Sequence, residues 1–538
     1  MVLTEVPPAP TWVDIGAQSS PGLDLLGLRL PVQYLGSLSL DGVTSVTPSV
    51  RYLSFLSWIA HSYASARRPD RAEDYRSFAA SAETAIVLGN LLLDRGTPGL
   101  IGSDEGGELV DGNRDPLPLE PLVRQLAVRI YANPATQLGL VFPRESGVPG
   151  LTQERGLPLA LAMADRAASC RLGGLLARGE TIESARREDL IELGRLVAVR
   201  AIPDAERALL LAAILPPDPR DQDLPRIGSL ALLLALASRH RRVPEESDLF
   251  EEARAPKRRL PPELHAALDG WLRYSVRDLL AAAGEAAFGK VLRSLEESGG
   301  TEHAVEAARV VEARVVAEEK QLRPLRELGL VCSGETLARL RFETFHQRIV
   351  GLARTPRAVS GGLARWTGGL DEWTLTSATL DGAAPSLTLL LAAWSLAVLR
   401  TEPWTLAKAE PFEGRAGLGA SRMGLAEVVG PAVEGLRRRN PTLREAAAEI
   451  VYRVVDQHLR VAWSRMATDA RRDVAALTSD ESLWQRREKP VRAARTASRL
   501  AQAIGWLVQL ELVGPKGLTA AGRRALDGAL ARLREASA

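Results

Sequence analysis

Residues 510–519 read LELVGPKGLT, and this stretch decides how the fold is interpreted. A short apolar run, a Gly-Pro-Lys turn and a second apolar run lead to Thr519, a residue type that favours the start of a helix. Residues 138–152 begin LGLV and end GLT, and so repeat the pattern around a longer turn. Residues 328–334 read LGLVCSG, keep only the first half, and are predicted to be a helix end. The two complete copies predict small β-hairpins, each followed by a helix.

Two predicted helices precede the last hairpin. Pro490 favours the first position of a short helix, and Thr496 is a suitable cap for a second one. The second helix has apolar residues at helical spacing, which predict one buried face: Leu500, Ile504, Leu507 and Val508.

This order of helix, helix, strand, turn, strand and helix resembles a winged helix-turn-helix domain over residues 484–533. In that family the second helix enters the major groove of DNA and the wing touches phosphates. The basic side chains suit phosphate, and a glutamine can read adenine. The resemblance therefore implies double-stranded DNA as a partner, contacted by Arg492, Arg495, Arg499, Gln502 and Lys516.

Residues 117–170 resemble the same family more weakly. Near their hairpin they carry few basic residues, Arg144 and Arg155, so the first copy is interpreted as a surface that docks protein. Winged helices also serve as docking or dimerisation modules, and this alternative stays open for the C-terminal copy.

A second resemblance lies in residues 22–63. The strings LLGL, GVTSVT and RYLSFLSW, in that order, are similar to the start of a group of large uncharacterised bacterial proteins, some of which occur in restriction and phage-defence gene clusters. This resemblance implies a helical subunit associated with antiviral defence. Read without it, the same residues predict a turn followed by a buried aromatic helix.

The composition indicates a soluble, cytoplasmic bacterial protein of two to four domains. The chain has 538 residues, 46% of them hydrophobic and 25% charged, and only two cysteines. Arginine outnumbers lysine by 62 to 6, a bias typical of GC-rich bacterial genomes. The net charge is +2, but residues 430–538 carry 20 basic and 12 acidic side chains. A basic C-terminal fifth indicates a surface that faces a polyanion, or alternatively an ordinary arginine-rich helix face. No apolar run is long enough to suggest a membrane span.

Helical periodicity dominates the chain and predicts a mainly α, multidomain helical protein with small β-wings. The strings that break it predict four parts: an arm and helical hairpin over 1–116, a winged-helix-like module with helices over 117–240, a helical domain with a Gly/Trp-rich insertion over 263–430, and a basic helical region with the winged helix over 431–538. Within these parts, Thr47-Pro48 is predicted to start a helix, residues 97–116 to form a loop, residues 119–130 a helix and residues 373–376 a strand.

No catalytic signature stands beside these modules, and we expect no catalytic residue, metal or cofactor. Residues 284–291 read GEAAFGKV, which has the spacing of a phosphate-binding loop but lacks its Ser/Thr and a preceding strand. Glu318 and Lys320 have the spacing of some nuclease sites, but fall in a predicted helix. The six histidines lie outside metal-ligand spacing of one another and of cysteine.

The sequence therefore predicts a non-catalytic DNA-binding or scaffold subunit of a bacterial multiprotein assembly, in an anti-phage setting, with other protein subunits as partners. A stand-alone transcriptional regulator and an enzyme with a dispersed active site are the alternatives.

Overall fold

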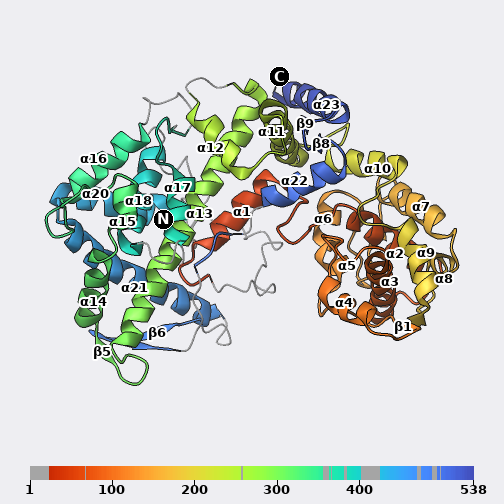
Figure 1. The fold of residues 1–538 in the computed structure, drawn as a ribbon, viewed down its shortest axis with the longest axis horizontal. Coiled ribbons are helices and arrows are strands. Elements are labelled where there is room, and N and C mark those ends of the chain that lie inside the picture. The colour runs from red at the N-terminus through yellow and green to blue at the C-terminus, as the bar shows by residue number, and fades with distance from the viewer. Residues whose placement is uncertain are drawn as a thin grey trace, which may run out of the picture. The chain divides into compact units, whose positions relative to one another are not determined.

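The computed structural model describes residues 24–66, 68–255, 259–354, 363–364, 366–380, 385–401, 424–468, 474–487, 493–496 and 499–537. The fold is mainly α, as predicted (Figure 1). Among the described residues, the sheets are small and have two or three strands each.

The chain forms two compact units, each assembled from separate stretches of sequence. The first unit comprises Met1–Leu35, Ser247–Leu260 and Leu268–Ala497. The second unit comprises Gly36–Glu246, Pro261–Ala267 and Ser498–Ala538. Residues 431–538, predicted as one C-terminal part, thus divide between the two units.

The second unit contains most of the short helices and three two-stranded sheets, β1–β4, β2–β3 and β8–β9. Its elements are α2 (Tyr52–Ser65), α3 (Ala72–Leu93), α4 (Ser103–Asp111), β1 (Leu117–Pro118), α5 (Ala127–Ile130), α6 (Ala132–Gln137), β2 (Val141–Phe142), β3 (Gly150–Leu151), α7 (Gly156–Ala167), α8 (Arg171–Ala177), β4 (Ser184–Ala185), α9 (Arg187–Leu196), α10 (Asp204–Ile214), η3 (Asp221–Asp223), α11 (Leu224–His240), η4 (Pro262–Leu264), α22 (Arg499–Gln509), β8 (Val513–Gly514), β9 (Gly517–Leu518) and α23 (Ala520–Ser537).

The first unit contains the longest helices and one three-stranded sheet of order β5–β7–β6. Its elements are α13 (His265–Glu297), β5 (Val305–Glu306), α14 (Ala307–Glu319), α15 (Arg323–Glu327), α16 (Phe342–Ala353), α17 (Glu372–Leu380), α18 (Ser386–Thr401), η5 (Leu425–Val429), α20 (Gly430–Arg439), α21 (Leu443–Thr468), β6 (Leu477–Asp480) and β7 (Leu483–Arg486). The division between the units falls within α1 (Arg29–Ser39), at the start of α12 (Glu246–Arg254) and near the start of α13.

Helix α2 is buried nearly all round, as its aromatic sequence predicts. It begins at Tyr52, later than the Thr47-Pro48 pair that the sequence suggested, because residues 44–51 form turns first. Arg51, at the end of those turns, is fully buried and pairs through Nη2 with Glu206 of α10 at 2.8 Å. A buried charge of this kind is tolerated only when it is paired and hydrogen-bonded.

The two predicted hairpins are present, and each has the same pattern of hydrogen bonds around its threonine. In the C-terminal copy the Thr519 hydroxyl donates to the Glu511 and Leu512 carbonyls and accepts from the Gly522 amide. In the first copy Thr152 makes the corresponding bonds with Gly139, Leu140 and Gly156. Residues 328–334, the incomplete third copy of the pattern, follow α15 directly. Gly329 has φ 72°, and the stretch is a helix end as predicted.

Three sequence-based predictions of local structure were wrong. Residues 373–376, expected as a strand, lie within helix α17, where Leu375 and Thr376 are buried. The predicted loop over residues 97–116 contains helix α4. The helix expected over residues 119–130 is reduced to α5, and the residues before α5 form turns and bends. In each case packing or turn chemistry overrides a weak local periodicity.

The Thr519 network requires glycine at position 522. A Cβ at Gly522 would lie 2.0 Å from the Leu512 carbonyl oxygen, whereas a Cβ at Gly528, on the same helix, would lie 3.5 Å from the nearest atom, Nη1 of Arg532. We expect Gly522→Ala to lower the free energy of unfolding by about 1–3 kcal/mol through overpacking. Gly528→Ala should instead raise it by about 0.5–1 kcal/mol, because alanine favours a helix. Urea unfolding of both variants checks this, and equal effects would contradict the close contact.

His458 of α21 joins three parts of the first unit. Its Nε2 lies 2.9 Å from the Ala476 amide nitrogen, and its Nδ1 lies 3.0 Å from the Leu25 carbonyl oxygen. The ring therefore accepts at Nε2 and donates at Nδ1, which is the neutral tautomer. Burial against Phe288 disfavours the charged form and lowers the pKa of His458 to about 4.

This depressed pKa makes the stability of the first unit sensitive to acid. An unfolded histidine takes up its proton near pH 6.5, whereas folded His458 resists protonation down to about pH 4. Stability is therefore complete above pH 6.5 and should fall by about 2–3 kcal/mol as the pH drops to 4. Urea unfolding at several pH values checks this, with His458→Gln as the comparison. The variant should lose that part of the pH slope, and an unchanged slope would contradict the assignment.

Candidate nucleic-acid interface

Helix α22 is hydrogen-bonded to residues 37–50 of the second unit. It is the helix that the resemblance assigns to the major groove. The buried Trp506 ring donates from Nε1 to the Thr47 carbonyl at 2.8 Å. The Gln509 amide donates to the Pro48 carbonyl and accepts from the Val50 amide at 2.9 Å. These bonds satisfy backbone groups of an irregular segment that has no ladder of its own.

Two of the predicted DNA contacts take part in the same attachment. Arg499 donates to the Val43 carbonyl at 3.0 Å and to the Ser37 hydroxyl at 2.7 Å. Gln502 donates to the Ser45 carbonyl at 3.2 Å. The part of α22 that carries these two side chains therefore packs on the protein itself.

Arg495 belongs to the first unit and is also engaged. Its Nε lies 3.0 Å from Oδ2 of Asp278, and its guanidinium lies 4.8 Å from the centre of the Trp373 ring. The Thr496 amide donates to the same carboxylate at 2.8 Å, so residues 495–496 are held on α13. Arg492 lies outside the described residues, as does Pro490.

Among the predicted contacts that lie within the described residues, Lys516 is the one that is exposed. It occupies the turn between β8 and β9, and no ion pair with another described residue is found for it. The next residue, Gly517, has φ 88°, and a Cβ there would lie 2.8 Å from the Arg241 Cα atom. The wing therefore rests on the C-terminal end of α11, and only glycine fits this contact.

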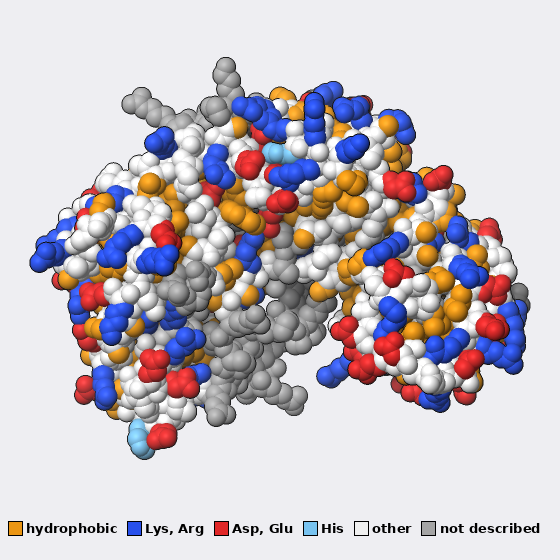
Figure 2. Space-filling view, in the orientation of Figure 1, with side chains coloured by type: hydrophobic (Ala, Val, Ile, Leu, Met, Phe, Trp, Pro, Cys, Tyr) orange, Lys and Arg blue, Asp and Glu red, His pale blue; other side chains and the backbone are white. Residues whose placement is uncertain are grey.

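Three further cations accompany Lys516 and were missed in the sequence: Arg241, after α11, and Arg523 and Arg524, on α23. All three are exposed, and no described carboxylate lies within ion-pair distance of them. Figure 2 shows Lys and Arg side chains gathered over α23 and the end of α11. The adjacent pair Arg523-Arg524 was visible in the sequence, but Arg241 reaches the wing only through packing. We call Arg241, Lys516, Arg523 and Arg524 the basic wing surface.

The two arginines that the sequence analysis named near the first hairpin both have partners in the protein. Arg144 pairs with Asp70 at 2.8 Å, and Arg155 donates to the Leu138 carbonyl at 3.1 Å. The predicted role of this copy, docking to protein, remains a prediction.

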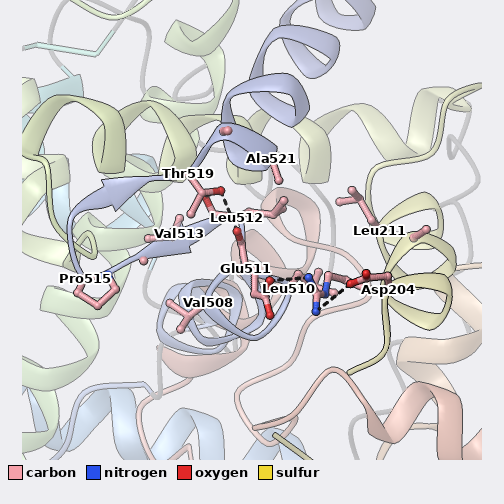
Figure 3. Close-up of a pocket in the computed structure, with 14 residues that line it drawn as sticks. Asp204, Leu211, Val508, Leu510, Glu511, Leu512, Val513, Pro515, Thr519 and Ala521 are labelled. Carbon is pink, nitrogen blue, oxygen red and sulfur yellow. Dashed lines mark hydrogen bonds and ion pairs between the residues drawn. The ribbon is translucent and has the colours of Figure 1, made fainter. Parts of the chain in front are cut away.

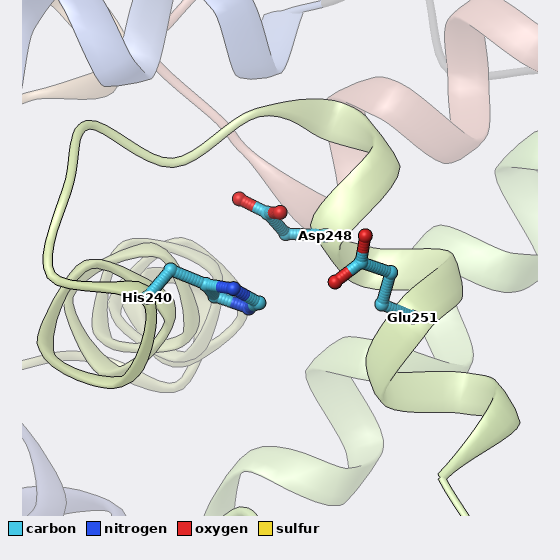
Figure 4. A group of neighbouring side chains, drawn as sticks. All are labelled: His240, Asp248 and Glu251. Atoms are coloured by element: carbon cyan, nitrogen blue, oxygen red, sulfur yellow. The ribbon is translucent and has the colours of Figure 1, made fainter.

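Glu318, considered for a nuclease site, has a structural role. Buried Glu318 accepts from the backbone amides of Leu387 and Thr388 at 2.9 and 2.8 Å, and so caps α18. Residues 284–291 lie within α13, as the sequence indicated. His240 ends α11 in the second unit, whereas Asp248 and Glu251 stand one turn apart on α12 in the first (Figure 4). We assign no metal to these side chains.

Comparison with known proteins adds no relative to this description. Searches against family models, curated proteins and solved structures found no match to the chain. Within the part of the chain described, no helix is both long and apolar enough to cross a membrane.

The different surroundings of Arg499 and Lys516 predict different effects on stability. Arg499→Ala should lower the free energy of unfolding by about 1–2 kcal/mol, because two acceptors in residues 37–43 lose their donor. Lys516→Ala should change it by less than about 0.5 kcal/mol, as expected for an exposed side chain without a partner. Chemical denaturation checks both variants. A stable Arg499→Ala protein would show that these hydrogen bonds contribute little.

Proposed function

We propose that this chain is a non-catalytic subunit that contacts double-stranded DNA through the basic wing surface of its second unit. The observation that carries the proposal is a set of four exposed cations, Arg241, Lys516, Arg523 and Arg524, without carboxylate partners among the described residues. Arginines elsewhere in the described chain commonly pair with Asp or Glu, as Arg144, Arg323 and Arg534 do. Exposed cations that lack carboxylate partners are suited to phosphates.

This proposal moves the contact from the helix to the wing. Arg499 and Gln502 are committed to residues 37–45, so they are poorly placed to read bases. Contact through the wing and α23 would reach mainly the phosphate backbone, which carries little sequence information. We therefore propose binding that depends strongly on salt and weakly on DNA sequence. The setting that we propose, a larger bacterial assembly in phage defence, rests on the resemblance of residues 22–63.

The proposal is tested by the affinity of the full chain for a fluorescein-labelled duplex of about 21 base pairs, two helical turns. Fluorescence anisotropy is measured over a series of salt concentrations. The triple variant Lys516→Glu, Arg523→Glu and Arg524→Glu should bind at least about tenfold more weakly. Its slope of log affinity against log salt should be smaller by about 2–3, since each phosphate contact contributes about 0.9.

A matched control has the same change in net charge elsewhere in the second unit. Arg124→Glu, Arg129→Glu and Arg171→Glu replace three exposed arginines on and near α5 and α8. This control should retain the slope of the unmodified chain. Equal losses of affinity in the two triple variants would show that net charge alone determines binding. Absence of salt-dependent binding in the unmodified chain would refute DNA contact.

A further inference from the structure

A groove of about 730 Å³ lies in the second unit, beside the β8–β9 hairpin (Figure 3). One wall is α10, with Ala208 and Leu211. The opposite wall combines the end of α22, the first strand of the hairpin and the start of α23. The lining on this side consists of Val508, Leu510, Glu511, Leu512, Val513, Gly514, Pro515, Thr519, Ala520 and Ala521.

The lining of the groove is largely apolar and includes one partly exposed aliphatic side chain, Val508. Val508 is 39% exposed, although its neighbours Trp506 and Leu507 on α22 are buried. The sequence predicted that Val508 would lie on the buried face of this helix, and the structure places it in the groove instead. Leu211, Val513 and Pro515 extend the same apolar lining. Covering such a surface would be favourable by the hydrophobic effect.

The rim of the groove is acidic. Asp204 and Glu511 have side chains that are 97% and 65% exposed. The single cation of the lining, Arg207, is 23% exposed and lies 3.5 Å from Asp204 and 2.5 Å from Glu511. Figure 3 shows these interactions as dashed lines that start at Asp204 and at Glu511. One arginine between two carboxylates leaves the rim with a net negative charge, which favours a partner that carries cations.

We propose that this groove docks an amphipathic helix of a partner protein, with an apolar face toward Val508 and Leu211 and basic residues beside Asp204 and Glu511. Helices commonly bind in this way, through apolar anchors at positions i, i+3 or i+4, and i+7. Addition of a strand to the hairpin is disfavoured, because β8 offers only Val513 and Gly514 for pairing. The proposal is independent of DNA contact, since none of the four cations of the basic wing surface lines the groove.

The probe for this proposal is a fluorescein-labelled model helix of about 14 residues, four turns, built of leucine and lysine. A second peptide has the same leucine pattern with glutamate in place of lysine. In anisotropy titrations with the full chain, the lysine peptide should bind at least about tenfold more tightly than the glutamate peptide, because only the first complements the acidic rim.

Two pairs of variants locate the binding. Val508→Asn should weaken the lysine peptide at least about fivefold, since it removes an apolar anchor. Leu161→Asn changes an equally exposed aliphatic residue on α7 and should have no effect. Asp204→Lys should weaken binding more at low salt than at high salt, whereas Asp218→Lys, at an exposed site outside the lining, should not. Thermal unfolding of all four variants confirms that each is folded.

Several results would overturn the proposal. Equal affinities of the two peptides would show that the acidic rim does not select the partner. Equal effects of Val508→Asn and Leu161→Asn would show that the peptide binds outside the groove. Binding of a small apolar dye that the lysine peptide fails to displace would identify the groove as a small-molecule site. Self-association of the unmodified chain that Val508→Asn abolishes would identify the occupant as a second copy.

Discussion

The attachment of α22 to residues 37–50 is the constraint on which the second unit depends. Residues 43–50 run through turns, so their backbone carbonyls and amides need partners from elsewhere. Helix α22 supplies them from four positions that lie three or four residues apart on one side: Arg499, Gln502, Trp506 and Gln509. The Trp506 and Thr47 residues that meet are 459 positions apart in the chain. The hairpin and α23 are held by α11 as well, so this attachment and the contact with α11 together place the last elements in the unit.

That attachment also decides which surfaces remain for partners. Because one side of α22 faces residues 37–50, its end contributes Val508 to the groove and directs the hairpin onto the end of α11. The hairpin then separates two surfaces of different chemistry. Val513, Gly514 and Pro515 line an apolar groove with an acidic rim, and the next residue, Lys516, belongs to the basic wing surface. The residues of one small hairpin thus contribute both to an apolar groove and to a cationic surface.

The parts of the fold that the sequence predicted correctly have local causes. The mainly α class follows from helical periodicity, and the two hairpins follow from turn residues and a threonine cap within about fifteen positions. The addition of β5 to the local β6–β7 hairpin was missed because β5 and β7 lie far apart along the chain, and such pairing leaves no local pattern. The helix at residues 372–380 was missed because its threonines favour strands, whereas packing in the first unit overrides that preference.

In the candidate site, too, contacts with distant residues could not be predicted from the local sequence. Arg499 and Gln502 have the residue types of DNA contacts, but their hydrogen-bond acceptors lie in residues 37–45, which no inspection of the C-terminal sequence would reveal. Lys516 was identified because a turn of two residues between short strands is exposed wherever the hairpin packs. Arg241 joins it only through the close approach of Gly517.

The discontinuity of the second unit has a consequence for the order of folding during synthesis. Chains usually fold from the N-terminus as they are made, with each domain completing before the next emerges. Here residues 37–50 wait for α22, so the second unit completes only after residues 499–537 have left the ribosome. The first unit, which ends at Ala497, has all its parts before then. A nascent chain of this protein therefore leaves the carbonyls of residues 43–48 without their donors on α22 for most of its synthesis, whereas α2 and α3 can pack much earlier on α7 and α9.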